Sequence, residues 1–499
     1  MWMKRPRIPG NHPPIVRAKI PWLGHAMSLL KDESNLVKHA RLQYPKDGII
    51  ALPVAGRLVY LVTNNEVASQ IYRQTRNFAF DPLALRVSSA FGCNSNDMKI
   101  LEEGTLASPQ KVNPNQQTRP GILTQFHRMT AEHLMGDSLH RMTSIFVEYL
   151  ASGISEMFPE NDENSFEWQD IELVDFVKKQ WTKASIISMF GTNIFKVWPE
   201  IDEWIWRFDP QVTPLMTKLP KVIYPHAHQL REEGLNRFIA WEREAKENYS
   251  FTDERADWDV FWGLKFLKMR AALAEEYGLS ERGRAAIQLS LFWGQNANAI
   301  PIATWLCVKA LTTPNVLSSI MPELKASMNN KNKKCQVNFL ALFKQPHLCT
   351  LLLETYRWST SSPTVRVVQE DTQVGRYALL KDNIVIIHGR SLQMDTTIWT
   401  SSAPDFDTQR FLSSDAEKKK KRLQALRHFG GGQNLCPGRH FASNEILGGF
   451  ALLMNLLEFD VPQDELLRTG MPKVDLSEGK QGGLWPDRGL MVRVRRRRG

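Results

Sequence analysis

The sequence predicts an α+β fold that is mostly α-helical, with small β-sheets near both ends of the chain. Apolar residues recur at three- and four-residue spacings from about Ile122 to Ala310, which is the periodicity of helices that bury one face. Short β-like runs occur in the first hundred residues and return near the C-terminal end. Because strands and helices do not alternate along the chain, a doubly wound parallel sheet is disfavoured.

The composition is that of a folded protein with an excess of positive charge. The 499 residues are 42% hydrophobic and 23% charged, which permits a sizeable core, and the net charge is +10. The five cysteines are widely spaced and form no Cys-x-x-Cys pair, so a disulfide framework and a structural zinc site are disfavoured. No run of about 18 apolar residues is present, so the sequence predicts no transmembrane helix.

Residues 1–30 are expected to be a leader segment and residues 31–499 a single domain. The leader is basic and rich in proline, a composition typical of the segment that follows a membrane anchor. We therefore expect an anchor upstream of this segment to be missing or removed.

Two basic runs, Lys418–Arg422 and Arg495–Arg498, carry part of the positive charge. Runs of this kind are usually solvated loops or tails. No zinc-finger spacing or RNP-like string accompanies them, so nucleic acid is not expected as a partner. A membrane surface with anionic lipids or an acidic protein partner fits the charge equally well.

The strands are expected to be short and to pair in small sheets. A Gly-Arg turn separates the first two runs and predicts a hairpin, and a polar stretch rich in Pro, Gln and Asn predicts a surface loop at 104–121. The expected strands are Ile49–Pro53, Leu58–Thr63, Thr364–Val368, Ile384–His388 and Leu490–Val494.

A long central helix is expected from Ser280 to about Leu311. Ser280 can cap its first turn. Pro301 lacks the N–H that would bond to the carbonyl of Ala297, so a kink is expected there, with a free carbonyl beside Gly294. Such a groove could hold water or a small ligand.

The most informative stretch is the loop from His428 to Ala442. Three consecutive glycines at 430–432 lack Cβ atoms, so the backbone can approach a flat ligand closely and adopt positive φ. Phe429 can pack against the same ligand.

Cys436 is the expected metal ligand in this loop. Pro437 suits the first position of a helix, and a helical pattern follows from Arg439 to Leu456. Cys436 is therefore expected at the N-cap, where unpaired N–H groups and the helix dipole stabilise a thiolate. A soft anionic sulfur is a suitable axial ligand for haem iron.

This loop resembles the cysteine signature of the cytochrome P-450 family, F-x-x-G-x-x-x-C-x-G-x-x-x-A. The resemblance implies haem b between the long kinked helix and the cysteine loop, NADPH as the electron source through a reductase, and a single haem-thiolate catalytic domain. Asn434 departs from the pattern, because the family usually has Arg or His there to bind a haem propionate. The implied cofactor-binding residues in the loop are Phe429, Gly430, Gly432, Asn434, Cys436, Gly438 and Ala442.

Glu354 and Arg357 share one face of a helix of about a dozen residues that starts near Pro346, so their charges can pair. The pattern resembles the family's E-x-x-R motif. In the family an arginine before the haem loop completes this motif, and Arg410 has that place here. The resemblance implies a structural network whose loss abolishes haem incorporation.

Further arginines and the central helix complete the implied site. Arg366, and less clearly His127 and Arg128, are implied propionate partners. In most of the family the central helix reads A-G-x-D/E-T, whose acid and alcohol deliver protons during oxygen activation. This chain has Ala297 and Asn298 there, which resembles the sterol 7α/12α-hydroxylase and prostacyclin synthase branch. The haem-loop string is also similar to that of filamentous-fungal members.

Three functions remain open from the sequence. The first is a haem-thiolate monooxygenase that oxidises a lipophilic substrate such as a sterol, a terpenoid or a related polycyclic natural product, at the cytosolic face of the endoplasmic reticulum membrane. The second is an isomerase or lyase that needs no reductase, because the proton-delivering pair is absent. The third is a haem-binding carrier or sensor without turnover. The family implies a substrate pocket with the residues Phe80, Phe292, Asn296, Thr364, Val365 and Leu484.

Overall fold

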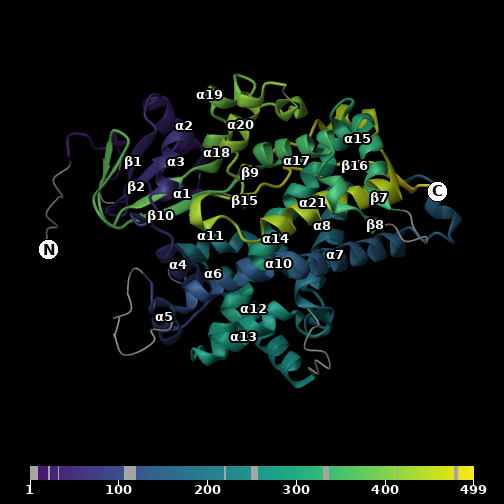
Figure 1. Cartoon of the computed structure of the whole chain (residues 1–499), viewed down its shortest axis with the longest axis horizontal. Helices are drawn as coiled ribbons and strands as arrows, with labels where there is room; N and C mark the ends of the chain where they lie inside the picture. The colour runs from purple at the N-terminus through teal and green to yellow at the C-terminus, as the bar shows by residue number, and fades with distance from the viewer. Residues whose placement is uncertain are drawn as a thin grey trace.

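The computed structural model describes residues 9–18, 20, 23–31, 33–105, 120–217, 221–248, 257–329, 336–412, 414–476 and 482–498. Helices make up most of the molecule, and the largest sheet lies at one end, beside the N-terminus (Figure 1). The expectation of a mostly α fold with small sheets is therefore confirmed. Most of the loop expected at 104–121 lies outside the described residues.

The largest sheet has the strand order β1-β2-β13-β10-β3. β1 (Ile49–Val54) and β2 (Arg57–Val62) are antiparallel, β13 (Ile384–Ile387) runs parallel to β2, and β10 (Thr364–Val368) joins it to β3 (Phe78–Ala79). The four strands expected in this region are therefore confirmed to within two residues at their ends.

The hairpin turn lies one residue earlier than expected. Ala55 and Gly56 form it, with φ of 46° and 82°. Two successive positive φ values match the twist of antiparallel strands, which explains the tight connection. The N-terminal segment packs on this hairpin through bridges from Ile15 to Ala51 and from Gly24 to Val54.

The central helix α14 (Glu281–Thr312) is confirmed and runs through the middle of the molecule (Figure 1). The Ser280 hydroxyl accepts the N–H of Gly283 at 3.0 Å, so the expected cap is present. The helix continues through Pro301. It packs against α8 (Leu173–Phe190), α12 (Pro225–Asn248), α17 (Pro346–Ser359) and α21 (Arg439–Leu456), which explains why its sequence is apolar on most sides.

The helix α21 follows the cysteine loop and lies deep in the core. A Cβ on Gly448 would come within 2.5 Å of the Phe339 ring, and one on Gly449 within 2.6 Å of the Trp181 ring. Only glycine allows this close approach. The indole N–H of Trp181 donates to the carbonyl of Glu445 at 3.1 Å. These contacts fix the helix that carries the cysteine loop.

The C-terminal arginine run differs from the solvated tail expected of such sequences. Two of its four residues, Arg495 and Arg496, belong to β16 (Met491–Arg496), which pairs with β14 (Leu457–Asp460) and β4 (Gln169–Glu172). Arg495 and Arg497 both pair with Glu458, at 2.7 and 3.3 Å. Glu458 on the neighbouring strand, and Glu160, which pairs with Arg496, therefore offset part of the charge of the run.

The other helices and strands surround this frame. In the described part of the chain, no helix has the length and apolar character needed to cross a bilayer. The other helices are α1 (Ala26–Lys31), α2 (Glu33–Gln43), α3 (Asn65–Arg73), α4 (Asp81–Phe91), α5 (Ser95–Glu102), α6 (Ile122–His133), α7 (Gly136–Met157), α9 (Ile194–Val197), α10 (Ile201–Phe208), α11 (Val212–Met216), α13 (Lys265–Glu276), α15 (Val316–Ala326), α16 (Phe339–Leu342), α18 (Gly389–Gln393), α19 (Thr396–Trp399), α20 (Ala416–Ala425) and α22 (Gln463–Thr469). The other strands are β5 (Trp258–Asp259), β6 (Gly263–Leu264), β7 (Met328–Asn329), β8 (Gln336–Val337), β9 (Thr360–Ser361), β11 (Thr372–Val374), β12 (Tyr377–Leu379) and β15 (Gly482–Gly483).

Candidate active site

A cavity of about 510 Å³ lies between the central helix α14, the strand β10 and the cysteine loop. Most of its wall is apolar, with contributions from α4, α6 and α21 as well. The charged or titratable side chains in the wall are few, and they are Arg270, Tyr356, Arg366, His428, Cys436 and Glu445.

The cysteine loop lies at one side of this cavity in a closed turn. The backbone N–H of Cys436 donates to the carbonyl of Phe429 at 3.1 Å. Gly430 and Gly432 have φ of 77° and 70°, the left-handed values that glycine accepts without strain. Phe429, Gly430, Asn434, Cys436, Gly438 and Ala442 all line the cavity. Gly432 does not, and a Cβ there would come within 2.8 Å of the carbonyl oxygen of Tyr72.

Cys436 is not the N-cap of α21, contrary to the expectation from the sequence. The N-cap is Gly438, and the helix begins at Arg439, so Pro437 lies outside it. A turn in which the N–H of Arg439 approaches the carbonyl of Cys436 separates the cysteine from the helix. The backbone N–H groups of Gly438 and Arg439 still point at the sulfur and lower its pKa, but burial has the larger effect and raises the pKa of the thiol.

Arg366 enters the cavity from β10. Its side chain is 5% exposed, its guanidinium donates to the carbonyl of Val365 at 2.8 Å, and it lies over the Phe80 ring at 5.2 Å. Burial lowers its pKa. In the described residues no carboxylate lies within ion-pair distance of it. A buried guanidinium without an internal counter-ion is suited to an anionic group of a ligand.

Arg128 lies elsewhere, and this corrects the expectation that it binds the cofactor. Its side chain is 80% exposed and pairs with Glu132 at 2.8 Å on the outer face of α6. His127 is exposed as well. The inner face of α6 instead presents Thr130 to the cavity. A one-residue step on a helix turns a side chain by about 100°, so neighbouring positions face different ways.

The same geometry separates the expected residues of α14. Asn298 lines the cavity, and its Oδ1 accepts the N–H of Gly483 at 3.2 Å. Ala297 is buried and does not line the cavity. Gly294 lines it one turn before Asn298, as expected for the groove.

Half of the expected substrate-pocket residues line the cavity, namely Phe80, Thr364 and Val365. Phe292, Asn296 and Leu484 do not, and this part of the expectation is corrected. Phe292 packs among Phe190 and Phe238 on the opposite face of α14, and the Asn296 side-chain amide donates to the carbonyl of Phe292 at 2.8 Å. Leu484 is fully buried, and its carbonyl accepts the indole N–H of Trp305.

The sequence reasoning missed a buried carboxyl group, Glu445, which borders the cavity from α21. The Ser185 hydroxyl donates a hydrogen bond to the Glu445 carboxyl group at 2.9 Å, and burial raises the pKa of Glu445 to about 8. The Gln295 amide donates to the carbonyl and the hydroxyl of Ser185, at 2.6 and 3.0 Å. Glu445 comes one turn after Ala442, so the helical period after the cysteine loop could have indicated it.

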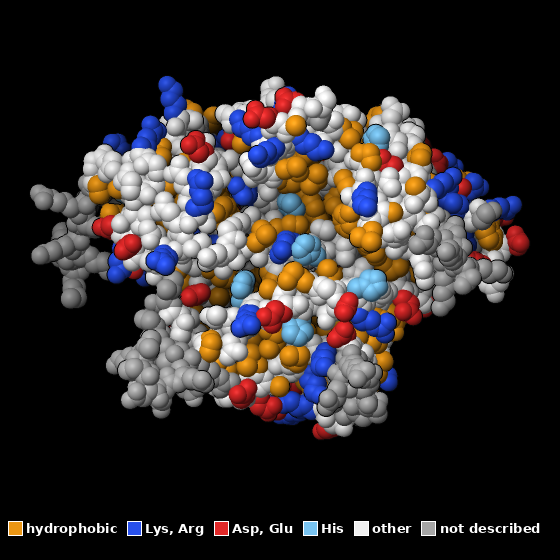
Figure 2. Space-filling view, in the orientation of Figure 1, with side chains coloured by type: hydrophobic (Ala, Val, Ile, Leu, Met, Phe, Trp, Pro, Cys, Tyr) orange, Lys and Arg blue, Asp and Glu red, His pale blue; other side chains and the backbone are white. Residues whose placement is uncertain are grey.

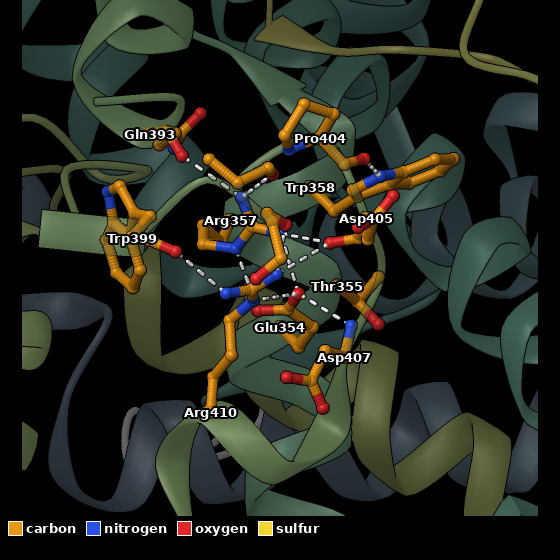
Figure 3. Close-up of polar contacts among 12 residues, drawn as sticks. Glu354, Thr355, Arg357, Trp358, Gln393, Trp399, Pro404, Asp405, Asp407 and Arg410 are labelled. Atoms are coloured by element: carbon orange, nitrogen blue, oxygen red, sulfur yellow. Dashed lines mark hydrogen bonds and ion pairs between the residues drawn. The ribbon is translucent and has the colours of Figure 1, made fainter. Parts of the chain in front are cut away.

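Glu354, Arg357 and Arg410 meet in a fully buried network beside the cavity wall (Figure 3). Arg357 donates to both carboxylate oxygens of Glu354, at 2.6 and 2.8 Å, and Arg410 donates to one of them at 3.1 Å. The N–H of Asp407 donates to the same carboxylate at 2.9 Å. Both guanidinium groups also donate to backbone carbonyls of the segment 393–405, so the network ties α17 to that segment.

The chain can hold a haem group with the residues described. Cys436 offers a sulfur ligand, Arg366 offers a cation for a propionate, and the apolar walls suit the macrocycle. The Nδ1 atom of His428 is buried and has no partner in the described residues, although this ring stacks on Tyr356. A ligand in the cavity would give this atom a partner.

Comparison with known proteins supports this fit. The family model for Cytochrome P-450 matches residues 13–480. A cytochrome P-450 monooxygenase from Hormonema carpetanum is 25% identical over 96% of this chain and 89% of its own length. A second from Humicola fuscoatra is 24% identical over 98% and 88%. Cholesterol 7-alpha-monooxygenase from Cricetulus griseus is 22% identical over 97% and 93%.

These matches confirm the expected family, the expected branch of relatives, and an oxidoreductase of the monooxygenase class. They also support haem b as the cofactor, with NADPH supplying electrons indirectly. Because the family model covers most of the chain, including the cysteine loop and the central helix, the chain belongs to the cytochrome P-450 family.

Proposed function

We propose that this chain is a haem-thiolate monooxygenase that uses O2 and reductase-delivered electrons to oxidise a lipophilic substrate, namely a sterol, a terpenoid or a related polycyclic natural product. The observation that carries the proposal is Cys436 in the wall of a largely apolar cavity of about 510 Å³ that Asn298 also lines. The relatives include a cholesterol 7-alpha-monooxygenase, which supports the substrate class.

Each side chain of the site has a separate task in this proposal. Haem, when bound, supplies the chemistry of oxygen activation, to which a thiolate ligand contributes electron density. Cys436 holds the metal, and the N–H groups of Gly438 and Arg439 stabilise the charge on its sulfur. Arg366 binds a propionate of the cofactor. The apolar walls exclude water and hold the lipophilic substrate.

Asn298 orients water or dioxygen in the groove of α14. Its Oδ1 is held by the N–H of Gly483, which leaves the amide N–H groups available to the cavity. Ala297 cannot take part in proton transfer, since it has no polar side chain and is buried. Of the two polar side chains, Asn298 can orient a hydrogen-bonded molecule, whereas the Glu445 carboxyl group can exchange a proton.

The central experiment is the absorption spectrum of the reduced, carbon monoxide-bound protein. We expect the band typical of thiolate-ligated haem in the wild type and its loss in Cys436→Ala. A Cys436→Ala protein with an unchanged band would overturn the assignment. Asn298→Leu should keep the band and lose most turnover, and unchanged turnover would remove Asn298 from the mechanism.

A reductase-independent isomerase or lyase is the alternative function. It is favoured by one observation, the absence of an acid–alcohol pair where Ala297 and Asn298 stand. Turnover of a lipophilic substrate panel with and without NADPH and a reductase discriminates the two. Product formed in the absence of both would favour the alternative.

We also propose that the reductase docks near α20, at the cytosolic face of the endoplasmic reticulum membrane. The lysines at 418–421 are exposed on this helix, and basic side chains gather there in Figure 2. Arg422 belongs to the core instead, because it is 7% exposed and donates to the carbonyl of Arg410. The exposed cations precede the cysteine loop directly, so an acidic partner would approach the cofactor from this side.

A further inference from the structure

Arg270, on α13, is a buried cation with an unusual environment. The side chain is 8% exposed and borders the cavity. Its Nη2 donates to the carbonyl of Ile287 at 3.3 Å, which is a long bond, and its Nε is buried without a partner. The guanidinium lies over the Phe126 ring at 4.4 Å. In the described residues no carboxylate lies within ion-pair distance of it.

Arg284, a second buried arginine, has the ion-pair partner that Arg270 lacks among the described residues. Arg284 is buried to the same degree, and it pairs with Glu242 at 2.6 Å and donates to the carbonyl of Leu279. An unpaired buried charge is costly, and such side chains are normally paired or hydrogen-bonded in full. Burial lowers the pKa of Arg270 to about 10, so the group is still charged at neutral pH.

Arg270 and Arg366 lie on different parts of the cavity wall. α6 contributes Thr130 to the wall, and Leu134 directly after this helix lines it as well, whereas α14 contributes Ser290 and Leu291. These are different elements from β10 and the start of α4, which surround Arg366. The cavity therefore has two buried cations on separate parts of its wall. Its only carboxyl group among the described residues, Glu445, is held largely neutral at pH 7 by burial.

We propose that Arg270 binds a carboxylate inside the cavity. Two carboxylates could occupy this position, a propionate of the cofactor or an acidic group of the substrate. Both offer a planar pair of oxygens to a planar guanidinium, which gives two charge-assisted hydrogen bonds. If the carboxylate belongs to the substrate, then the lipophilic substrate of the proposed function carries an acid group. The inference rests on that function only through the shared cavity.

The test uses purified haem-loaded protein and two matched probes, dodecanoate and dodecanol, which differ only in the anionic group. Haem per chain and the spectral dissociation constant of each probe are measured for the wild type, Arg270→Met and Arg270→Lys. Lys309→Met is the matched control, because Lys309 is a buried cation that packs on Trp358 and does not line the cavity.

Each source of the carboxylate gives its own result. If the substrate supplies it, Arg270→Met keeps its haem and loses about 10- to 100-fold in dodecanoate affinity, with dodecanol unchanged. If the cofactor supplies it, Arg270→Met loses haem, and the probe affinities per haem stay the same. In both cases Arg270→Lys recovers part of the loss, and Lys309→Met behaves as the wild type.

Other results would overturn the inference. They are an Arg270→Met protein that keeps both its haem content and its dodecanoate affinity, or one that keeps its haem and loses affinity equally for both probes, which indicates altered packing. A wild type with the thiolate-type carbon monoxide band that fails these tests would remove the role of Arg270 alone. A wild type without that band would instead remove the proposed function.

Discussion

Two neighbouring regions bury arginine side chains to a similar degree and satisfy them differently. In the network around Glu354, the carboxylate and several backbone carbonyls accept bonds from Arg357 and Arg410. In the cavity, Arg366 and Arg270 each donate to one backbone carbonyl and meet no carboxylate in the described residues. The first pair can be satisfied by the chain alone, whereas the second needs a ligand. The difference separates structural arginines from ligand-binding ones.

The largest effect on stability is expected from Glu354→Gln, which removes the carboxylate of the buried network with Arg357 and Arg410. The substitution leaves two guanidinium groups buried without a counter-ion, so the free energy of unfolding should fall by about 3–5 kcal/mol and haem incorporation should fail. Chemical denaturation and haem per chain measure both effects. Glu458→Gln is the matched control, because Glu458 also pairs with two arginines but on a partly exposed strand, where we expect a loss below about 1 kcal/mol. Equal losses in the two variants would contradict the comparison.

The second prediction concerns Arg366→Leu in the cavity. The haem-free protein should be no less stable than the wild type, since an unpaired buried charge is removed. Haem should bind about 10- to 100-fold more weakly, because a charge-assisted contact to a propionate is lost. The rate of haem transfer to an acceptor apoprotein measures this, with Arg376→Leu, an exposed arginine paired with Asp47, as control. An unchanged transfer rate would exclude Arg366 from cofactor binding.

The third prediction concerns Glu445→Gln, which removes the buried carboxyl group of the cavity. Its pKa is raised to about 8 in the folded chain, so between about pH 5 and pH 8 the folded state holds a proton that the unfolded state has released. This group therefore makes the wild type less stable as the pH rises through that window. Denaturation at several pH values should show a flatter dependence in Glu445→Gln. Identical slopes in the two proteins would show that the carboxyl ionises freely.

The smallest effect on stability is expected from charge reversal of exposed lysines, because water already solvates these side chains. Lys420→Glu combined with Lys421→Glu should leave the melting temperature nearly unchanged and raise the KM for the reductase several-fold, with a weaker salt dependence. Steady-state kinetics with a purified reductase measure this. Lys99→Glu on α5, which lies far from α20 in Figure 1, is the control and should leave the KM unchanged. A double variant with the wild-type KM would remove α20 from the docking surface.

Local patterns in the sequence sufficed for much of this molecule. The cap at Ser280, the strand Thr364–Val368, the helix Arg439–Leu456 and the cysteine loop follow from residues close together in the chain, since capping, periodicity and glycine conformation are local properties. The spacing of Glu354 and Arg357 likewise predicted that the two charges could pair.

The tertiary structure alone decided which side of each helix meets the cavity and which charges find partners. Phe292 and Asn296 lie on the far side of α14 from Asn298, and Arg128 points away from α6's inner face, because packing sets the rotation of a helix about its axis. Arg270 and Arg284 are buried to a similar degree, but among the described residues only Arg284 has a carboxylate beside it. Such pairing depends on segments far apart in the chain, which no local pattern records.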